Sequence, residues 1–127
     1  MKLLSGIFFD YIHFHNCFFT QIINGGEQMR TDKLWENIEQ GVVLMDFSAD
    51  WCAPCKAQEP IIKKITKTYL NRASIVEVNI DENKKLATKY MVQSIPTLIL
   101  FKNGKEIKRF VGLQPEITIT KSLDDAL

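Results

Sequence analysis

The sequence predicts an α/β protein in which a mixed central sheet of about four strands is flanked by helices. An apolar run at residues 42–47 and a β-branched run at residues 74–80 are separated by a helical segment, and such a crossover makes two strands parallel. A third apolar run, at residues 97–101, is followed by Asn103-Gly104, a dipeptide typical of the tight turn in an antiparallel hairpin. The sheet should therefore contain parallel and antiparallel pairs.

The first elements alternate helix, strand and helix. A short amphipathic helix is expected from Thr31, with Gly41 just beyond its end. Residues 42–47 suit a strand buried on both faces, because apolar side chains occupy nearly every position. Residues 56–70 predict a long helix, and Pro60 is expected to bend it because proline removes a backbone hydrogen bond. The side chains of this helix expected to face the core are Ile61, Ile62, Ile65 and Tyr69.

The middle of the chain continues this alternation. Residues 74–80 predict the second strand because β-branched side chains favour strands. Asp81 is expected to cap a helix from about Glu82 to Tyr90. After the strand at residues 97–101, the Asn-Gly turn leads into a last strand at residues 106–111.

A final helix is expected to open at Gln114 and Pro115. Its core positions recur at four-residue spacing, at Ile119, Leu123 and Leu127. Residues 117–120 also alternate as a strand would, and this alternative stays open.

Size and charge limit the function. The chain has 127 residues, of which 46% are hydrophobic and 24% charged, and this predicts one compact domain. Its formal net charge is +1, with acidic and basic residues interleaved, so we expect no nucleic-acid partner. Three cysteines are too few for the many-bridge pattern of a small secreted scaffold.

Residues 1–28 differ in composition from residues 29–127, which form the expected domain. This extension holds five of the eight Phe, both His and Cys17, whose role the sequence does not indicate. A signal peptide or membrane anchor is one alternative, but Asp10 interrupts the apolar stretch that either would need. The other alternative is a translated leader: the four residues before Met29, Gly-Gly-Glu-Gln, can be encoded by a purine-rich ribosome-binding sequence. Met29 is then the start, and an intact mass corresponding to residues 1–127 would contradict it.

Cys52 and Cys55 form a Cys-x-x-Cys pair between the first strand and the long helix. A thiol at a helix N-terminus faces unpaired N–H groups and the positive end of the helix dipole, which lower its pKa below the usual value of about 8.5. Cys52 is therefore the expected nucleophile. Cys55, about one turn into the helix, is expected to be more buried and to resolve a mixed disulfide. Ala53 and Pro54 provide no cation to hold the thiolate, which favours a reductant over an oxidant.

Asp46 is a carboxylate in an otherwise apolar strand. Burial would raise its pKa and suit it to proton transfer to or from Cys55. The alternative is an ordinary strand residue that is solvated or hydrogen-bonded.

Metal binding is the main rival function for the cysteines. Structural zinc normally takes four ligands, and from Met29 onward the sequence has two cysteines and no histidine. We therefore expect no metal. The missing histidine also excludes a Cys-His hydrolase.

Residues 31–127 resemble the thioredoxin family. The resemblance rests on motifs that occur in the family's order and with similar spacing: Asp46-Phe47, Ala49, Trp51-Cys52-Ala53-Pro54-Cys55-Lys56, Pro60, Asn79-Ile80-Asp81, Ile95-Pro96-Thr97, Phe101-Lys102-Asn103-Gly104 and Val111-Gly112. It implies a thioredoxin fold and reduction of disulfides in client proteins by a bacterial, cytoplasmic, monomeric enzyme without a bound cofactor. It also implies electrons from NADPH through thioredoxin reductase.

Two other functions remain as alternatives to a cytoplasmic enzyme. One is an envelope reductase that is anchored or exported through residues 1–28. The other is a thioredoxin-like binding module that supports another protein without turnover.

The resemblance also implies roles for particular residues. Cys52 and Cys55 would form the redox disulfide. Because Ala53 and Pro54 provide no cation for the thiolate, we expect its potential to lie nearer about −270 mV, the value of thioredoxin, than about −180 mV, the value of a disulfide isomerase. Pro96 would be a cis proline facing the dithiol, and the backbone of Ile95 would pair with an extended client segment. The substrate-binding surface would comprise Trp51, Ala53, Pro54, Ile95, Pro96, Val111 and Gly112. From the residues alone, core packing remains the alternative for Trp51 and Ile95, and a strand-end glycine for Gly112.

Three positions depart from the common family pattern. Ser48 replaces a frequent tryptophan, Ala53 replaces the usual glycine, and Glu77 stands where many bacterial members have a lysine near the buried aspartate. If Glu77 lies close to Asp46, like-charge repulsion should raise the pKa of Asp46 further; if Glu77 points to water, this effect should vanish.

Overall fold

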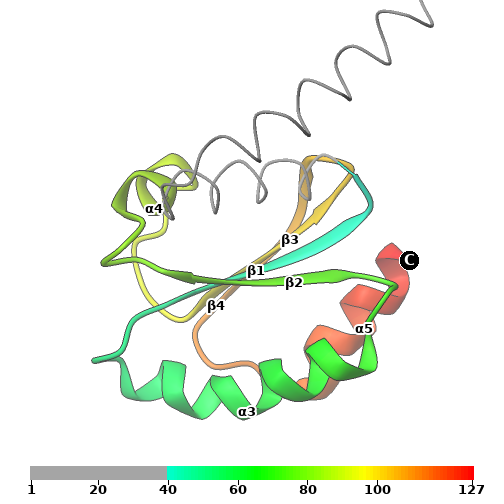
Figure 1. The fold of residues 1–127 in the computed structure, drawn as a ribbon, viewed down its shortest axis with the longest axis horizontal. Helices are drawn as coiled ribbons and strands as arrows, with labels where there is room; N and C mark the ends of the chain where they lie inside the picture. The colour runs from blue at the N-terminus through cyan, green and yellow to red at the C-terminus, as the bar shows by residue number, and fades with distance from the viewer. Residues whose placement is uncertain (1–39) are drawn as a thin grey trace, which may run out of the picture. The chain divides into compact units, whose positions relative to one another are not determined.

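A computed structural model describes residues 40–127. The expected extension at residues 1–28, Cys17 and the helix expected from Thr31 lie outside the described residues. Seven elements follow in the order β1 (Val42–Ser48), α3 (Ala53–Thr68), β2 (Ser74–Asn79), α4 (Lys84–Lys89), β3 (Thr97–Lys102), β4 (Lys105–Val111) and α5 (Glu116–Ala126). In Figure 1, α3 and α5 cover one face of the sheet, and α4 lies on the other side.

The sheet has four strands in the order β2-β1-β3-β4. β1 pairs in parallel with β2 and antiparallel with β3, and β3 pairs antiparallel with β4. The predicted mixed sheet, the parallel first pair and the closing hairpin are therefore confirmed. The register sets Asp46 of β1 opposite Glu77 of β2, which brings two acidic residues together at the dithiol end of the sheet.

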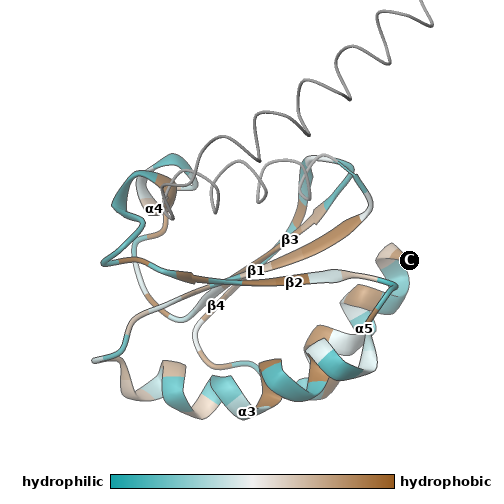
Figure 2. Ribbon diagram, in the orientation of Figure 1, coloured by the Kyte–Doolittle hydropathy of each residue, from teal (hydrophilic) through white to brown (hydrophobic). Residues whose placement is uncertain are grey.

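The core forms between the sheet and the pair of helices α3 and α5. β1 is buried at every position from Val42 to Phe47, as its apolar run predicts, and the brown central strands in Figure 2 show the same pattern. α3 contributes a buried face in which Cys55, Gln58, Ile62 and Ile65 recur every three or four residues. The predicted core residues Ile119 and Leu123 of α5 are fully buried, whereas Leu127 follows the helix and is exposed.

Several element boundaries differ from the prediction. α3 begins at Ala53, three residues before the predicted start, and Pro54 lies in its first turn, where proline costs no intrahelical hydrogen bond. Pro60 lies within α3 and does not divide it. Residues 117–120 are part of helix α5, so the strand alternative is wrong.

The prediction that Asp81 caps the fourth helix is wrong. α4 begins at Lys84, and Asn83 is its N-cap residue. The chain first makes a turn in which the Asp81 amide donates to Asn79 Oδ1 at 2.9 Å, and this turn delays the helix. The Asp81 carboxylate is then free to accept a hydrogen bond from the loop that carries the dithiol.

Candidate active site

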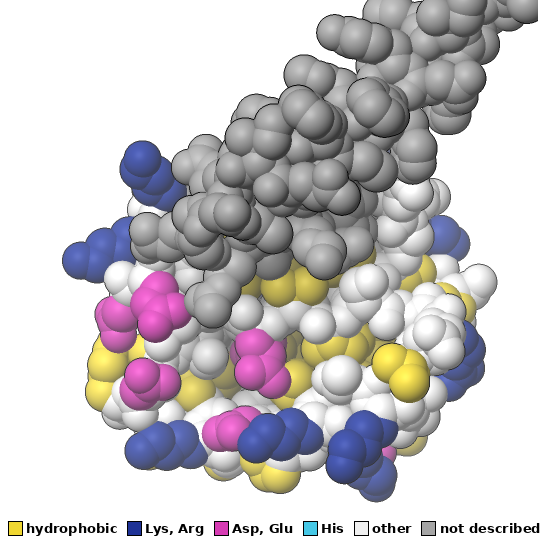
Figure 3. Space-filling view, viewed as in Figure 1, with side chains coloured by type: hydrophobic (Ala, Val, Ile, Leu, Met, Phe, Trp, Pro, Cys, Tyr) yellow, Lys and Arg dark blue, Asp and Glu magenta, His cyan; other side chains and the backbone are white. Residues whose placement is uncertain are grey.

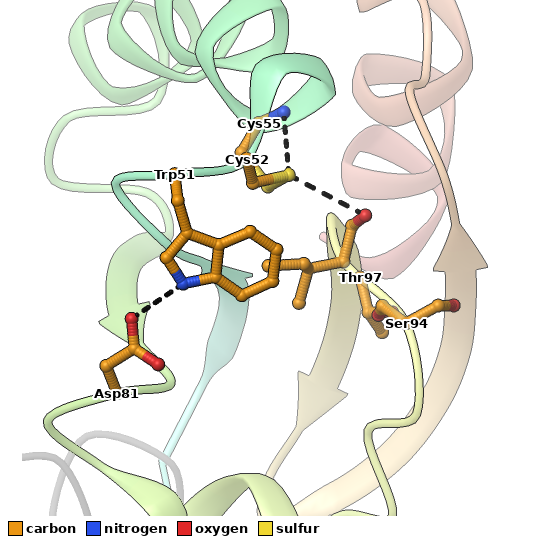
Figure 4. The surroundings of a disulfide bond; sticks show 7 residues. Trp51, Cys52, Cys55, Asp81, Ser94 and Thr97 are labelled. Carbon is orange, nitrogen blue, oxygen red and sulfur yellow. Dashed lines mark hydrogen bonds between the residues drawn. A yellow bond between two sulfur atoms is a disulfide. The ribbon is translucent and has the colours of Figure 1, made fainter.

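The dithiol lies where the loop after β1 enters α3. Cys52 is the N-cap of α3, and its Sγ accepts a hydrogen bond from the Cys55 amide at 3.3 Å. The two cysteines form a disulfide across Cα atoms that are 5.2 Å apart (Figure 4). The expected pairing at a helix N-terminus is therefore present, and a backbone N–H already points at the sulfur that would carry negative charge after reduction.

The expectation that Cys55 is more buried than Cys52 is wrong for this oxidised form. The exposed fractions are 5% for Cys52 and 6% for Cys55. Cys52 is covered because it packs in a small apolar cluster with Ala49, Cys55 and the half-buried Ile95. Burial alone therefore does not separate the attacking thiol from the resolving one, and the separation must come from the helix terminus and from the surface around Cys52.

Trp51 stands beside the dithiol rather than in the core. Its side chain is 68% exposed, and its indole Nε1 donates to Asp81 Oδ2 at 2.9 Å (Figure 4). An exposed indole held by a hydrogen bond is a preorganised apolar surface. Core packing, the alternative for Trp51, is thus excluded.

The loop before β3 lies next to Cys52. The Ile95-Pro96 peptide bond is cis, as the family resemblance implies. Cys52 Sγ lies 3.8 Å from the carbonyl oxygen of Ile95, and Pro96 is buried. The backbone of Ile95 therefore lies beside the sulfur that a client disulfide would approach.

The end of β4 adds the other side of this surface. Val111 is 61% exposed and pairs in register with Thr97, the residue after Pro96. The Gly112 amide donates to the Pro96 carbonyl at 2.8 Å, and Gly112 has φ 88°. A Cβ added at Gly112 would meet nothing within 4 Å, so the left-handed backbone, rather than crowding, requires glycine here.

Asp46 is 5% exposed, and within the described residues its Oδ1 has no hydrogen-bond partner. Asp46 is therefore neither solvated nor fully hydrogen-bonded. This excludes the alternative in which it is an ordinary strand residue. Burial raises its pKa from 3.8 to about 7, and repulsion from Glu77 and then Glu59 adds to the effect. Glu77 is exposed, but its position opposite Asp46 in the parallel pair keeps it near enough to act.

A cavity of about 300 Å³ joins Asp46 to Cys55. Its lining also includes the exposed residues Glu59 and Glu77, together with Ser48 and Lys56. Water in such a polar cavity can carry a proton between a thiol and a carboxyl group. The residue predicted to move the proton and the residue predicted to resolve the mixed disulfide thus share one space.

Sequence reasoning missed three residues that shape this site. Asp81, predicted to cap a helix, instead orients Trp51. Glu59 lines the cavity, and Gln58 is fully buried and bonds to the loop after Gly112. The three- and four-residue spacing from Cys55 through Gln58 to Ile62 would have indicated that Gln58 faces inward.

The described residues show neither a metal-binding cluster nor, on the face that Figure 3 draws, a surface of one charge. Residues 40–127 contain no group of three or more metal-binding side chains placed to hold an ion. Acidic, basic and hydrophobic side chains all occur on the face shown in Figure 3. None of the helices in this part of the chain is long and apolar enough to cross a membrane.

A family model, curated relatives and a solved structure all match this chain, and all of them are thioredoxins. The family model described as Thioredoxin matches residues 27–125. The thioredoxin of Staphylococcus haemolyticus is 44% identical over 92 residues, which cover 72% of this chain and 88% of that protein. The thioredoxin of Staphylococcus aureus strain Mu50 is 43% identical over 90 residues, covering 71% and 86%. Among solved structures, an N21Q mutant thioredoxin from Halobacterium salinarum superposes with a TM-score of 0.67 at 35% identity, covering 73% of this chain and 81% of that one.

Proposed function

This chain belongs to the thioredoxin family, and we propose how its residues divide the work of disulfide reduction. The chain is a thiol–disulfide oxidoreductase that reduces protein disulfides through Cys52 and Cys55. Neither a non-catalytic binding module nor an envelope-located variant is favoured by these similarities. The observation that carries the proposal is the position of Cys52 at the N-terminus of α3, beside the Ile95 carbonyl and bonded to Cys55, which lines a cavity together with Asp46.

Cys52 is the nucleophile. Its thiolate attacks one sulfur of the client disulfide, the client S–S bond breaks, and the other client sulfur leaves as a thiolate that takes up a proton. The hydrogen bond from the Cys55 amide and the helix terminus both favour the thiolate of Cys52. Trp51, Ile95, Pro96, Val111 and Gly112 dock the client around it, with Ala53 and Pro54 exposed at the start of α3.

Cys55 resolves the mixed disulfide, and Asp46 is its base. The Cys55 thiol gives its proton to the Asp46 carboxylate, the new thiolate attacks Cys52 Sγ, and the second client sulfur leaves as a thiolate that takes up a proton from water. The client has then gained two electrons and two protons, and the enzyme carries the Cys52–Cys55 disulfide. A pKa of about 7 leaves Asp46 part ionised at neutral pH, so it can accept a proton in this step and donate one when the enzyme is recharged.

The proposal also covers the electron source, the oligomeric state, the first residue and the cellular location of the protein. NADPH supplies electrons through a thioredoxin reductase, the role that family membership implies for a protein of this type. We propose that the functional unit is a bacterial, cytoplasmic monomer that begins at Met29. Fractionation of the native cell tests the location, and an intact mass tests the start.

Reduction of a protein disulfide tests the function directly. Full-length protein, NADPH and a bacterial thioredoxin reductase should reduce insulin, whereas Cys52→Ser should abolish turnover. Activity with dithiothreitol but not with the reductase would reject the proposed electron donor and leave the reductase activity standing. Turnover of Cys52→Ser at the rate of the unmodified enzyme would reject the mechanism.

A further inference from the structure

Gln58 is the one fully buried amide side chain of the described chain, and the mechanism above does not use it. It lies three residues after Cys55 on α3, with an exposed fraction of 0%. A buried polar side chain is costly unless its hydrogen bonds are made, so its partners indicate what it holds in place.

Both polar atoms of Gln58 bind one residue, Gln114. Gln58 Nε2 donates to the Gln114 carbonyl at 3.1 Å, and the Gln114 amide donates to Gln58 Oε1 at 2.7 Å. The two residues are 56 positions apart, so this pair joins the helix of the dithiol to the loop between β4 and α5. A two-point contact of this kind fixes orientation as well as distance.

The same loop carries one side of the client-docking surface. Gln114 Nε2 donates at 3.3 Å to the carbonyls of Val111 and Gly112, while the Gly112 amide is held by Pro96. Gly112 is therefore held from two directions: through Gln114 by α3 and directly by the loop before β3. Val111, the last residue of β4, is held in addition by its pairing with Thr97. No helix or strand includes residues 112–115. The position of this loop therefore depends on these hydrogen bonds.

We propose that Gln58 is a positioning residue that clamps the loop 112–115 to α3 and so sets the spacing between Cys52 and the docking residues Val111 and Gly112 at the start of this loop. The inference rests on the proposed function, because it assigns Val111 and Gly112 to the docking surface. α3 carries Cys52 at its N-terminus and Gln58 within the next two turns, so one rigid element positions both the reacting sulfur and the surface around it.

The test compares Gln58→Met, which keeps an unbranched side chain of similar length but cannot form either hydrogen bond, with the unmodified protein. Two substrates are used: insulin, which must dock, and 5,5′-dithiobis(2-nitrobenzoate), a small disulfide that does not need the docking loop. We expect KM for insulin to rise about tenfold with kcat within twofold, and the rate on the small disulfide to stay within twofold.

Lys64→Ala is the matched control. Lys64 Nζ contacts Glu116 Oε2 at 2.9 Å and also joins α3 to the start of α5, but this pair is exposed and does not hold the docking loop. Its KM for insulin should match that of the unmodified protein. An unchanged KM in Gln58→Met, or an equal fall in the rates on both substrates, would overturn the positioning role.

Hydrogen exchange tests the clamp independently of activity and of the variant's folding. In the unmodified protein the Gln114 amide should exchange at least tenfold more slowly than the amide of Leu113, whose side chain is 51% exposed. Equal exchange of the two amides would refute the clamp. Failure of the unmodified protein to reduce insulin would instead refute the proposed function, whichever exchange result is found.

Discussion

Replacing Asp46 with asparagine should stabilise the folded, oxidised protein by an amount that grows with pH. The folded pKa of Asp46 is about 7 against 3.8 for an unburied carboxyl group, because the side chain is buried and faces Glu77 and Glu59. The folded state therefore holds a proton that the unfolded state has lost, and the penalty develops as the pH rises from 3.8 to about 7. The side-chain amide of the substituted asparagine carries no charge and escapes this penalty.

The magnitude follows from the two pKa values. Their difference of roughly three, at about 1.36 kcal/mol for each pKa unit, gives a penalty of about 4 kcal/mol when Asp46 is fully ionised. At pH 8 Asp46→Asn should gain most of this, about 4 kcal/mol, and at pH 5 only about 2 kcal/mol. Below the unfolded pKa both states are protonated, and the gain should disappear.

Urea unfolding of the oxidised protein at pH 5 and pH 8 measures both values. Asp50→Asn is the matched control, because it makes the same chemical change at an exposed residue on the rim of the same cavity. Its unfolding free energy should change by less than about 0.5 kcal/mol at either pH. An Asp46→Asn gain that is equal at the two pH values, or absent at pH 8, would refute the account of Asp46.

Three further predictions concern neighbouring groups. Glu77→Gln removes one source of repulsion, so the pKa of Asp46 should fall. In urea unfolding measured from pH 5 to 8, the pH at which the loss of stability levels off should therefore move down. An unfolding free energy with the same pH dependence as in the unmodified protein would mean that Glu77 does not act on Asp46. Tyr69→Phe deletes the hydrogen bond from the Tyr69 hydroxyl to Asp124 at 2.7 Å and should cost about 1 kcal/mol of unfolding free energy, whereas no loss would show that water replaces it. Leu123→Ala, at a fully buried position of α5, should cost about 2 to 5 kcal/mol, and a cost below about 1 kcal/mol would contradict the described core.

The strands could be predicted from the sequence because their apolar runs report burial directly. The run at residues 42–47 forms the central strand β1, and the Asn103-Gly104 turn joins β3 and β4 antiparallel. The cis bond before Pro96 follows from the family resemblance alone, since most X-Pro bonds in folded proteins are trans.

The contacts between distant residues could not be predicted in the same way. Asp81 has the residue type of a helix cap, and only the folded chain shows that Trp51 takes its carboxylate as a partner. The sequence pattern predicts the strands but leaves the register between two of them undetermined by a residue or two. The register of β1 and β2 in the structure sets Glu77 opposite Asp46. Gln58 escapes prediction because glutamine in a helix is usually solvent-exposed, although its spacing from Cys55 and Ile62 indicates the buried face.

Trapping of the mixed disulfide tests the division of roles between the cysteines most directly. Reduced Cys55→Ser, mixed with oxidised insulin, should accumulate a covalent complex whose peptide map joins Cys52 to an insulin cysteine, because the thiol of Cys55 that resolves it is missing. Cys52→Ser should form at least tenfold less complex in the same time, since Cys55 lies inside α3 and faces the cavity of Asp46 rather than the docking surface. Equal trapping by the two variants, or no complex with Cys55→Ser, would contradict the assignment of Cys52 as the nucleophile.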